Sequence, residues 1–228
     1  MSLWNGRRFA PESYPLIAAP VRFAVVLLLS AFAGGCAARD TASELCVPNV
    51  HTVTPGVLVR GGQPDEPGLR ALRDVYGIRT VVNLNDRTAA SEAVLARRAG
   101  LNYLALPSNA LRLEPDKLLA FLKVVDDPGR NGAVYVHCKE GMDRTGAAVA
   151  AYRIVDCGWD ADRALAELRR HQSLSHTLLF LNLPPFVRGM GTHSAQWKAR
   201  LGEMPAPEVE HNEPDRGAKP QAAAAAPA

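Results

Sequence analysis

The chain has 228 residues, of which 47% are hydrophobic, so it can form one domain of ordinary size with extensions at its ends. Its formal net charge is only +3, and no run dense in Lys and Arg with interleaved aromatic residues occurs. Charge and composition therefore argue against a nucleic-acid-binding protein, and we expect no nucleic acid among its partners.

The first 36 residues have the composition of a signal peptide. Arg22 precedes an apolar run at residues 23–33, which is shorter than the roughly 20 residues needed to span a bilayer. The run leads into an Ala-Gly-Gly-Cys sequence that ends at Cys36 and resembles a bacterial lipobox, in which the cysteine is lipidated. We expect an exported lipoprotein of the bacterial cell envelope, anchored to the membrane through Cys36 and facing the periplasm. Another cleaved signal and an uncleaved anchor are the alternatives.

Residues 37–50 are expected to form a tether, and residues 51–190 the folded domain. Within this domain, strand and helix patterns alternate along the chain. Apolar and β-branched runs predict strands at residues 57–59, 78–84, 101–106 and 133–137. Caps, prolines and glycines delimit predicted helices at residues 66–76, 91–99, 116–125, 144–155, 161–171 and 177–183.

Strands separated by helices favour an α/β fold with a mainly parallel central sheet and helices on both faces. Residues 191–228 are expected to be an extension of this domain. After Pro205 the chain is rich in proline, glutamate and asparagine and then in alanine, which predicts a disordered tail.

The most informative segment lies between the predicted strand 133–137 and the helix that follows. Cys138 and Arg144 are six positions apart, and Gly141 allows the backbone between them to turn. A loop of this length can wrap its N–H groups around one phosphate-sized anion, and the following helix N-terminus favours both phosphate and a thiolate. Arg144 can hold two phosphate oxygens at once. The segment therefore predicts a phosphate-binding site with a cysteine nucleophile.

The pattern His-Cys-x5-Arg-Thr-Gly at residues 137–146 resembles the signature of the cysteine-dependent protein tyrosine and dual-specificity phosphatase superfamily. Residues 59–64 and 80–84 resemble segments of bacterial and Siw14-like atypical dual-specificity phosphatases. The resemblance covers about residues 51–175 and implies a dual-specificity-phosphatase-like fold.

The resemblance implies hydrolysis of phosphotyrosine, phosphoserine or phosphothreonine in proteins, or of a small phosphate ester, through a phosphocysteine on Cys138. Neither a cofactor nor a metal is implied. His137 and Thr145 are expected to support the loop and the thiolate. The expected phosphate-binding residues are Lys139, Glu140, Gly141, Met142, Asp143 and Arg144.

Three alternatives to a protein phosphatase stay open. The first is an inositol polyphosphate or phosphoinositide phosphatase, and the second is a catalytically weak phosphate-binding module. A rhodanese-like sulfurtransferase is disfavoured, because such loops usually hold one residue fewer and lack the Arg-Thr-Gly exit.

The general acid that protonates the leaving oxygen is less well defined. Many dual-specificity phosphatases place an aspartate just after the strand equivalent to residues 101–106, whereas this chain has Pro-Ser-Asn at residues 107–109. Asp143 is our first choice, because its loop resembles the Cys-x4-Asp-Arg loops of myotubularins and some secreted bacterial tyrosine phosphatases. Asp116 and Asp86 are the alternatives, as is the absence of an acid.

Two further questions stay open from the sequence. Export would permit a disulfide between Cys46 and Cys157, and two unpaired thiols are the alternative. Arg60 and Gln63 either line the phosphate pocket or are ordinary turn residues.

Overall fold

The structure is a computed structural model that describes residues 47–212. The expected signal, most of the tether, Cys36 and Cys46 lie outside the described residues, as do residues 213–228. Within the described part, no helix is both long and apolar enough to cross a membrane.

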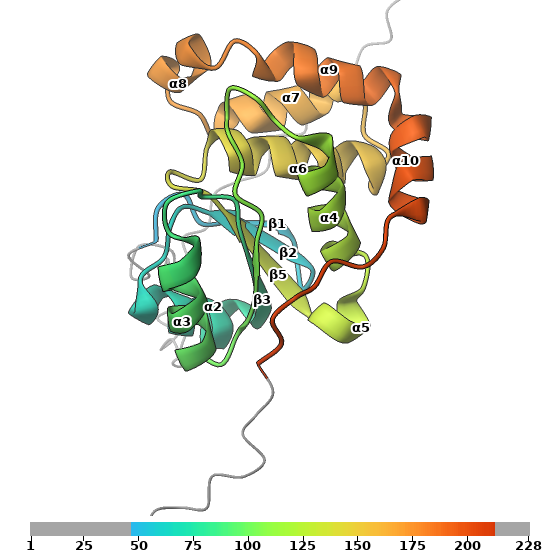
Figure 1. Cartoon of the computed structure of the whole chain (residues 1–228). Coiled ribbons are helices and arrows are strands. Elements are labelled where there is room, and N and C mark those ends of the chain that lie inside the picture. Colours follow the sequence, from blue (N-terminus) through green and yellow to red (C-terminus); the bar gives the residue numbers. More distant parts are fainter. Residues whose placement is uncertain (1–46, 213–228) are drawn as a thin grey trace, which may run out of the picture. The chain divides into compact units, whose positions relative to one another are not determined.

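A five-stranded sheet forms the centre of the domain, in the order β1-β2-β5-β3-β4 (Figure 1). β1 is antiparallel to β2 at one edge, and the other three pairings are parallel. The mainly parallel sheet is therefore confirmed. The strands are β1 (His51–Thr54), β2 (Leu58–Gly61), β3 (Ile78–Asn83), β4 (Asn102–Ala105) and β5 (Ala133–His137).

Helices cover both faces of this sheet, as the sequence predicted. One face carries α2 (Glu66–Tyr76) and α3 (Ala89–Arg98), whose apolar residues share a core cluster with one side of the sheet (Figure 1). On the other face, α4 (Pro115–Val125) and α6 (Asp143–Val155) contact β5. Outside α6 lie α7 (Ala161–Arg170), α9 (Leu183–Thr192) and α10 (Ser194–Glu203). Two short helices complete the set, α5 (Pro128–Asn131) and α8 (Leu174–Leu179).

The central strand β5 contributes to both cores because successive side chains point to opposite faces of a sheet. Val134 and Val136 belong to the cluster beneath α4 and α6, whereas Tyr135 belongs to the cluster beneath α2 and α3. The alanine-rich α6 is buried on nearly all sides, because small side chains let neighbouring helices approach closely. These two elements fix the strand-loop-helix unit that holds Cys138.

The helix predicted at residues 177–183 is placed differently in the structure. Ser173 caps α8 by accepting a hydrogen bond from the backbone N–H of His176, so this helix begins earlier and ends at Leu179. Pro184 and Pro185 were expected to end a helix, but they lie in the first turn of α9. Proline is tolerated there because that turn needs no backbone donor.

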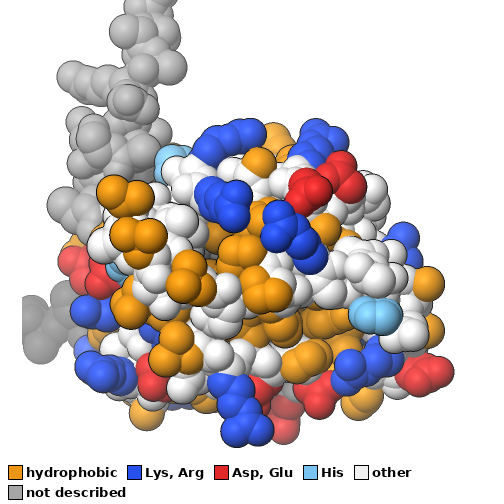
Figure 2. Space-filling model, turned by 90° about the horizontal axis from the view of Figure 1, so that it is seen from above, with side chains coloured by type: hydrophobic (Ala, Val, Ile, Leu, Met, Phe, Trp, Pro, Cys, Tyr) orange, Lys and Arg blue, Asp and Glu red, His pale blue; other side chains and the backbone are white. Residues whose placement is uncertain are grey.

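The surface around α8 is unusually apolar. Leu174, Leu178, Leu179 and Leu181 are all largely exposed. Figure 2, which views the molecule from the side of α8 and α9, shows hydrophobic side chains gathered on this face.

The packed domain is longer at both ends than the expected residues 51–190. Val47 and Val50 are buried against the sheet, although they were assigned to the tether. At the other end, α10 packs on α4 and α6, and Glu210 pairs with Tyr103 of β4 as an antiparallel bridge. The disordered tail therefore does not begin at Pro205. Neither β1 nor α5 was predicted, because β1 is a polar edge strand and α5 is a single turn.

Candidate active site

Cys138 directly follows β5, at the carboxyl end of the strand that lies between β2 and β3. Ligands of open α/β sheets bind at this edge. The next four residues form a loop that leads directly into the N-terminus of α6 at Asp143. The cysteine side chain is a free thiol at the base of the loop and is only 3% exposed. The expected strand-loop-helix unit is therefore present.

Gly141 is the residue on which the shape of the loop depends. Its φ of 74° lies in the left-handed region, a backbone conformation that residues with a Cβ atom rarely adopt. A Cβ atom here would also lie 2.5 Å from the carbonyl carbon of Gly61 and 2.6 Å from the nitrogen of Gly62. The loop thus rests directly on the backbone at the end of β2.

Arg60 in β2 and Gln63, just beyond the end of β2, brace this loop. The buried Arg60 donates from Nη2 to the Gly141 carbonyl at 2.6 Å, and burial lowers the pKa of Arg60 to about 10. The Gln63 backbone N–H donates to the Lys139 carbonyl at 3.0 Å. Arg60 therefore lies behind the loop and supports it. This role differs from the two that its sequence position suggested, which were lining the phosphate pocket and forming an ordinary turn.

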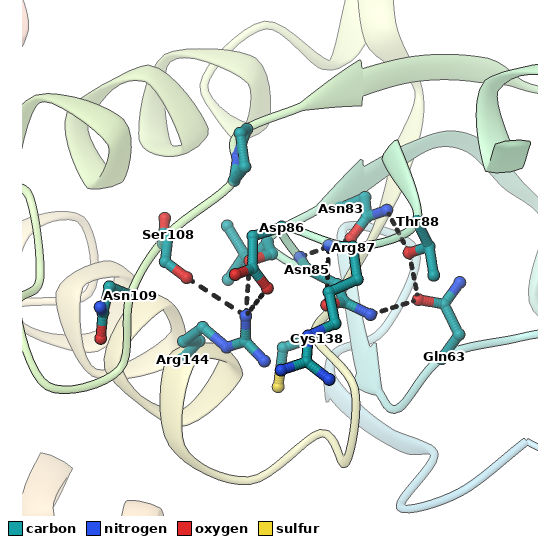
Figure 3. Close-up of polar contacts among 12 residues, drawn as sticks. Gln63, Asn83, Asn85, Asp86, Arg87, Thr88, Ser108, Asn109, Cys138 and Arg144 are labelled. Atoms are coloured by element: carbon teal, nitrogen blue, oxygen red, sulfur yellow. Dashed lines mark hydrogen bonds and ion pairs between the residues drawn. The ribbon is translucent and has the colours of Figure 1, made fainter. Parts of the chain in front are cut away.

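Arg144 extends from the first turn of α6 toward the loops after β3 and β4 (Figure 3). Its Nη1 atom donates to Asp86 Oδ1 and to the carbonyls of Leu84 and Ser108, at 3.2–3.3 Å. Nε and Nη2 make no hydrogen bond within the described residues. A phosphate group can therefore be held by these two nitrogens while Nη1 keeps the guanidinium in place.

A pocket of about 340 Å³ opens beside Arg144. The loops after β3 and β4 form much of its wall, and Lys139 and Phe180 also line it. Arg87 is a second arginine of this wall, and no pattern in the sequence distinguishes it from other exposed arginines. Lys139 and Glu140, which were expected among the phosphate-binding residues, form an exposed ion pair with each other at 3.2 Å.

The three candidate acids occupy different positions. Asp143 is buried beside the loop, where Gln172 and His176 contact its carboxylate. Asp86 is exposed, lines the pocket and pairs with Arg144. Asp116 pairs with Arg200 on the α4–α10 surface and does not line the pocket.

Behind Cys138, His137 belongs to a buried polar network. Its Nε2 lies 2.9 Å from Glu92 Oε1, and its Nδ1 lies 3.2 Å from the Cys138 carbonyl oxygen. Asn83 donates to the other oxygen of Glu92. Glu92 is almost fully buried within α3, and no pattern in the sequence marked it.

Thr145 was expected to donate its hydroxyl hydrogen to the thiolate. In the structure this fully buried hydroxyl instead makes a long hydrogen bond of 3.5 Å to the Gly61 carbonyl. It therefore ties α6 to the end of β2, close to the place where Gly141 rests.

Two remaining points concern metals and thiols. Within residues 47–212, no group of three or more His, Cys, Asp and Glu side chains is arranged to hold a metal ion. Cys157 is exposed at the end of α6, and its pairing with Cys46 stays untested because Cys46 lies outside the described residues.

Comparison with known proteins agrees with the fold and identifies the family. Residues 45–179 match the family described as "DSP-PTPase phosphatase fused to NAD+ Kinase". The chain therefore belongs to the DSP-PTPase phosphatases, the class of enzyme that the fold and the cysteine loop define.

Among individual proteins, the dual specificity protein phosphatase TpbA of Pseudomonas aeruginosa is 32% identical over 125 residues, which are 54% of this chain and 54% of TpbA. The chain thus spans about half the length of the curated relatives it matches. The crystal structure of TpbA superposes with a TM-score of 0.58 at 27% identity, covering 68% of this chain and 91% of that one. A cysteine-to-serine variant of TpbA has been solved in complex with phosphotyrosine.

A more distant structure supports the fold alone. The core catalytic domain of the PP-IP phosphatase SIW14 from S. cerevisiae has a TM-score of 0.56 at 18% identity, and the match covers 68% of this chain and 92% of that one.

Proposed function

We propose that this protein hydrolyses phosphate monoesters, with Cys138 as nucleophile and Arg144 as the main phosphate-binding side chain. The observation that carries the proposal is the buried Cys138 thiol, which lies at the base of a loop entering α6 beside Arg144. Preorganised donors around a transferring phosphoryl group supply most of the catalysis in such reactions.

The reaction proceeds in two steps. The Cys138 thiolate attacks phosphorus, and the S–P bond forms as the bond to the leaving oxygen breaks. That oxygen takes the electron pair together with a proton from the general acid, which we assign to Asp143. Water then attacks phosphorus, cleaves the S–P bond and returns a proton to the acid, so inorganic phosphate and the thiolate are released.

Phosphotyrosine in proteins is the substrate we propose first. The TpbA variant solved with phosphotyrosine supports this choice, because TpbA is 26% identical to this chain in that comparison. Phosphoserine and phosphothreonine belong to the same proposal, and inositol polyphosphates or phosphoinositides are the alternative. Parallel assays with a phosphotyrosine peptide, a phosphoserine peptide and inositol hexakisphosphate would separate these classes.

The basic test is hydrolysis of p-nitrophenyl phosphate by the full chain in reductant, without added metal. We expect Cys138→Ser to abolish turnover. Cys157→Ser is the matched control, because Cys157 is exposed and lies outside the loop, and it should keep full activity. Phosphate binding without turnover by the unaltered protein would instead indicate a binding module.

We also propose that the protein is exported and lipid-anchored. This proposal rests only on the sequence of residues 22–36. Cells that express the protein should incorporate labelled palmitate into it, and Cys36→Ser should abolish this labelling. Labelling that persists in the variant would exclude Cys36 as the lipidated residue.

A further inference from the structure

The Asp143 carboxylate is held on both of its oxygens by side chains from outside the phosphate loop. Gln172 Nε2 donates to Oδ1 at 2.6 Å, and His176 Nδ1 lies 2.6 Å from Oδ2. The Asp143 side chain is only 8% exposed, so bulk water does not replace either contact. Such short contacts fix the plane in which the carboxyl group lies.

Neighbouring side chains orient Gln172 and His176 toward Asp143. Thr177 Oγ1 donates to Gln172 Oε1 at 3.5 Å, which turns the amide N–H₂ group of Gln172 toward Asp143. The His176 ring lies against Phe180, with 5.5 Å between the ring centroids, and Phe180 lines the pocket beside Arg144. None of the residues of α8 is buried, so the helix does not serve to fill the core.

We infer that Gln172 and His176 are positioning residues, which hold the Asp143 carboxyl group in place for proton transfer to the leaving oxygen. The inference rests on the proposed role of Asp143 as general acid. Asp143 gives one proton to the leaving oxygen and regains one from the attacking water, so it ends each cycle unchanged.

The physical reason for such a clamp is the geometry that proton transfer requires. A general acid must come within about 2.6–3.2 Å of the atom that it protonates. Asp143 lies in the first turn of α6, and its χ angles would otherwise leave the carboxyl group several orientations. The contacts of Gln172 and His176, both in the α7–α8 segment, remove that freedom before substrate binds.

The test compares two aryl phosphates that differ in their need for an acid. Phenyl phosphate has a poor leaving group that must be protonated, whereas 2,4-dinitrophenyl phosphate has a good one. For His176→Phe we expect kcat on phenyl phosphate to fall about 10- to 100-fold, within the range of a general acid's contribution. The kcat on 2,4-dinitrophenyl phosphate and both KM values should change less than about twofold, since phosphate binding is untouched.

Three further variants separate positioning from a structural effect. His176→Asn keeps a group that can hydrogen-bond near the place of Nδ1 and should recover most of the lost activity. Gln172→Leu, which removes the other contact, should again reduce turnover of phenyl phosphate selectively. Leu178→Ala, an exposed position on the same helix, should behave like the unaltered protein on both substrates.

The Asp143→Asn variant tells the two proposals apart. If Asp143→Asn loses phenyl phosphate turnover selectively but His176→Phe does not, the positioning inference is overturned while the assigned acid stands. If Asp143→Asn affects both substrates equally, Asp143 is not the acid and the inference fails with it. Equal loss on both substrates in His176→Phe, without recovery in His176→Asn, would mean a purely structural role for His176.

Discussion

At the scale of single residues, the surroundings of Cys138 are set by side chains from distant parts of the sequence. Glu92 comes from α3 and Arg60 from β2, yet both are buried close behind the loop. A buried charge is tolerated only where partners compensate it, so each of these groups depends on the other members of its network.

Glu92→Gln should lower the free energy of unfolding by about 2–4 kcal/mol, because it leaves the buried His137 without its charged partner. Urea unfolding followed by fluorescence measures this difference. Glu114→Gln, at an exposed pair with Lys117, is the control and should cost less than about 0.5 kcal/mol. Equal losses in the two variants would contradict the network.

Gly141→Ala should abolish phosphatase activity, because the new Cβ would collide with the backbone at the end of β2 and reshape the loop. Gly56→Ala is a matched control, since Gly56 has a similar φ of 70° but its Cβ position is open. This control should lose about 1–2 kcal/mol of stability and keep its activity. Full activity in Gly141→Ala would disprove the close approach.

At the scale of elements, α10 belongs to the core although it lies beyond the boundary that the sequence suggested. Trp197 and Leu201 are buried in the cluster that contains α4 and α6. The chain then returns to the edge of the sheet, where Glu210 pairs with β4. Composition did not indicate that α10 belongs to the core, because polar residues lie between its buried positions.

Trp197→Ala should lower the free energy of unfolding by about 3–5 kcal/mol, the usual cost of deleting a large buried aromatic side chain. Lys198→Ala, at the exposed neighbouring position, is the control and should change stability by less than about 0.5 kcal/mol. Thermal and urea unfolding both report this difference. If the two variants unfold alike, α10 does not contribute to the core.

At the scale of the whole molecule, the edge strand β1 and the end of α7 meet beside Arg60. The rings of His51 and His171 lie 4.4 Å apart between their centroids. Burial, followed by the positive charge of Arg60, lowers the pKa of His171 to about 4. Of the other nearby groups, His51 and Arg170 act in the same direction and Glu167 opposes them.

This shift makes the stability of the domain depend on pH. The unfolded chain binds a proton at His171 near pH 6.5, whereas the folded chain does so only near pH 4. The contribution is therefore fully present above pH 6.5 and is lost as the pH falls toward 4. Glutamine does not titrate, so His171→Gln should lose less stability between pH 7.5 and 4.5 than the unaltered protein. The difference should be about 1 kcal/mol, because partial exposure of His171 screens the effect. Urea unfolding at both pH values measures it, and identical losses in both proteins would refute the assignment.

Much of the fold and the central loop could be predicted because their signals are local. The strand at residues 133–137, the caps at Asp65 and Asp160, and the glycine stop after Tyr76 all depend on near neighbours in the sequence. Spacing within one loop likewise placed Cys138 and Arg144 together. Such features need no knowledge of the rest of the chain.

Tertiary structure alone decided which side chains meet at this loop. The sequence offered Asp143, Asp116 and Asp86 as acids, and only folding put Asp116 on a remote surface and Asp143 between Gln172 and His176. It likewise brought Glu92 to His137 and Glu210 to β4. These pairs join residues far apart in the sequence, so their contacts arise from packing and leave no periodic or spacing signal in the chain.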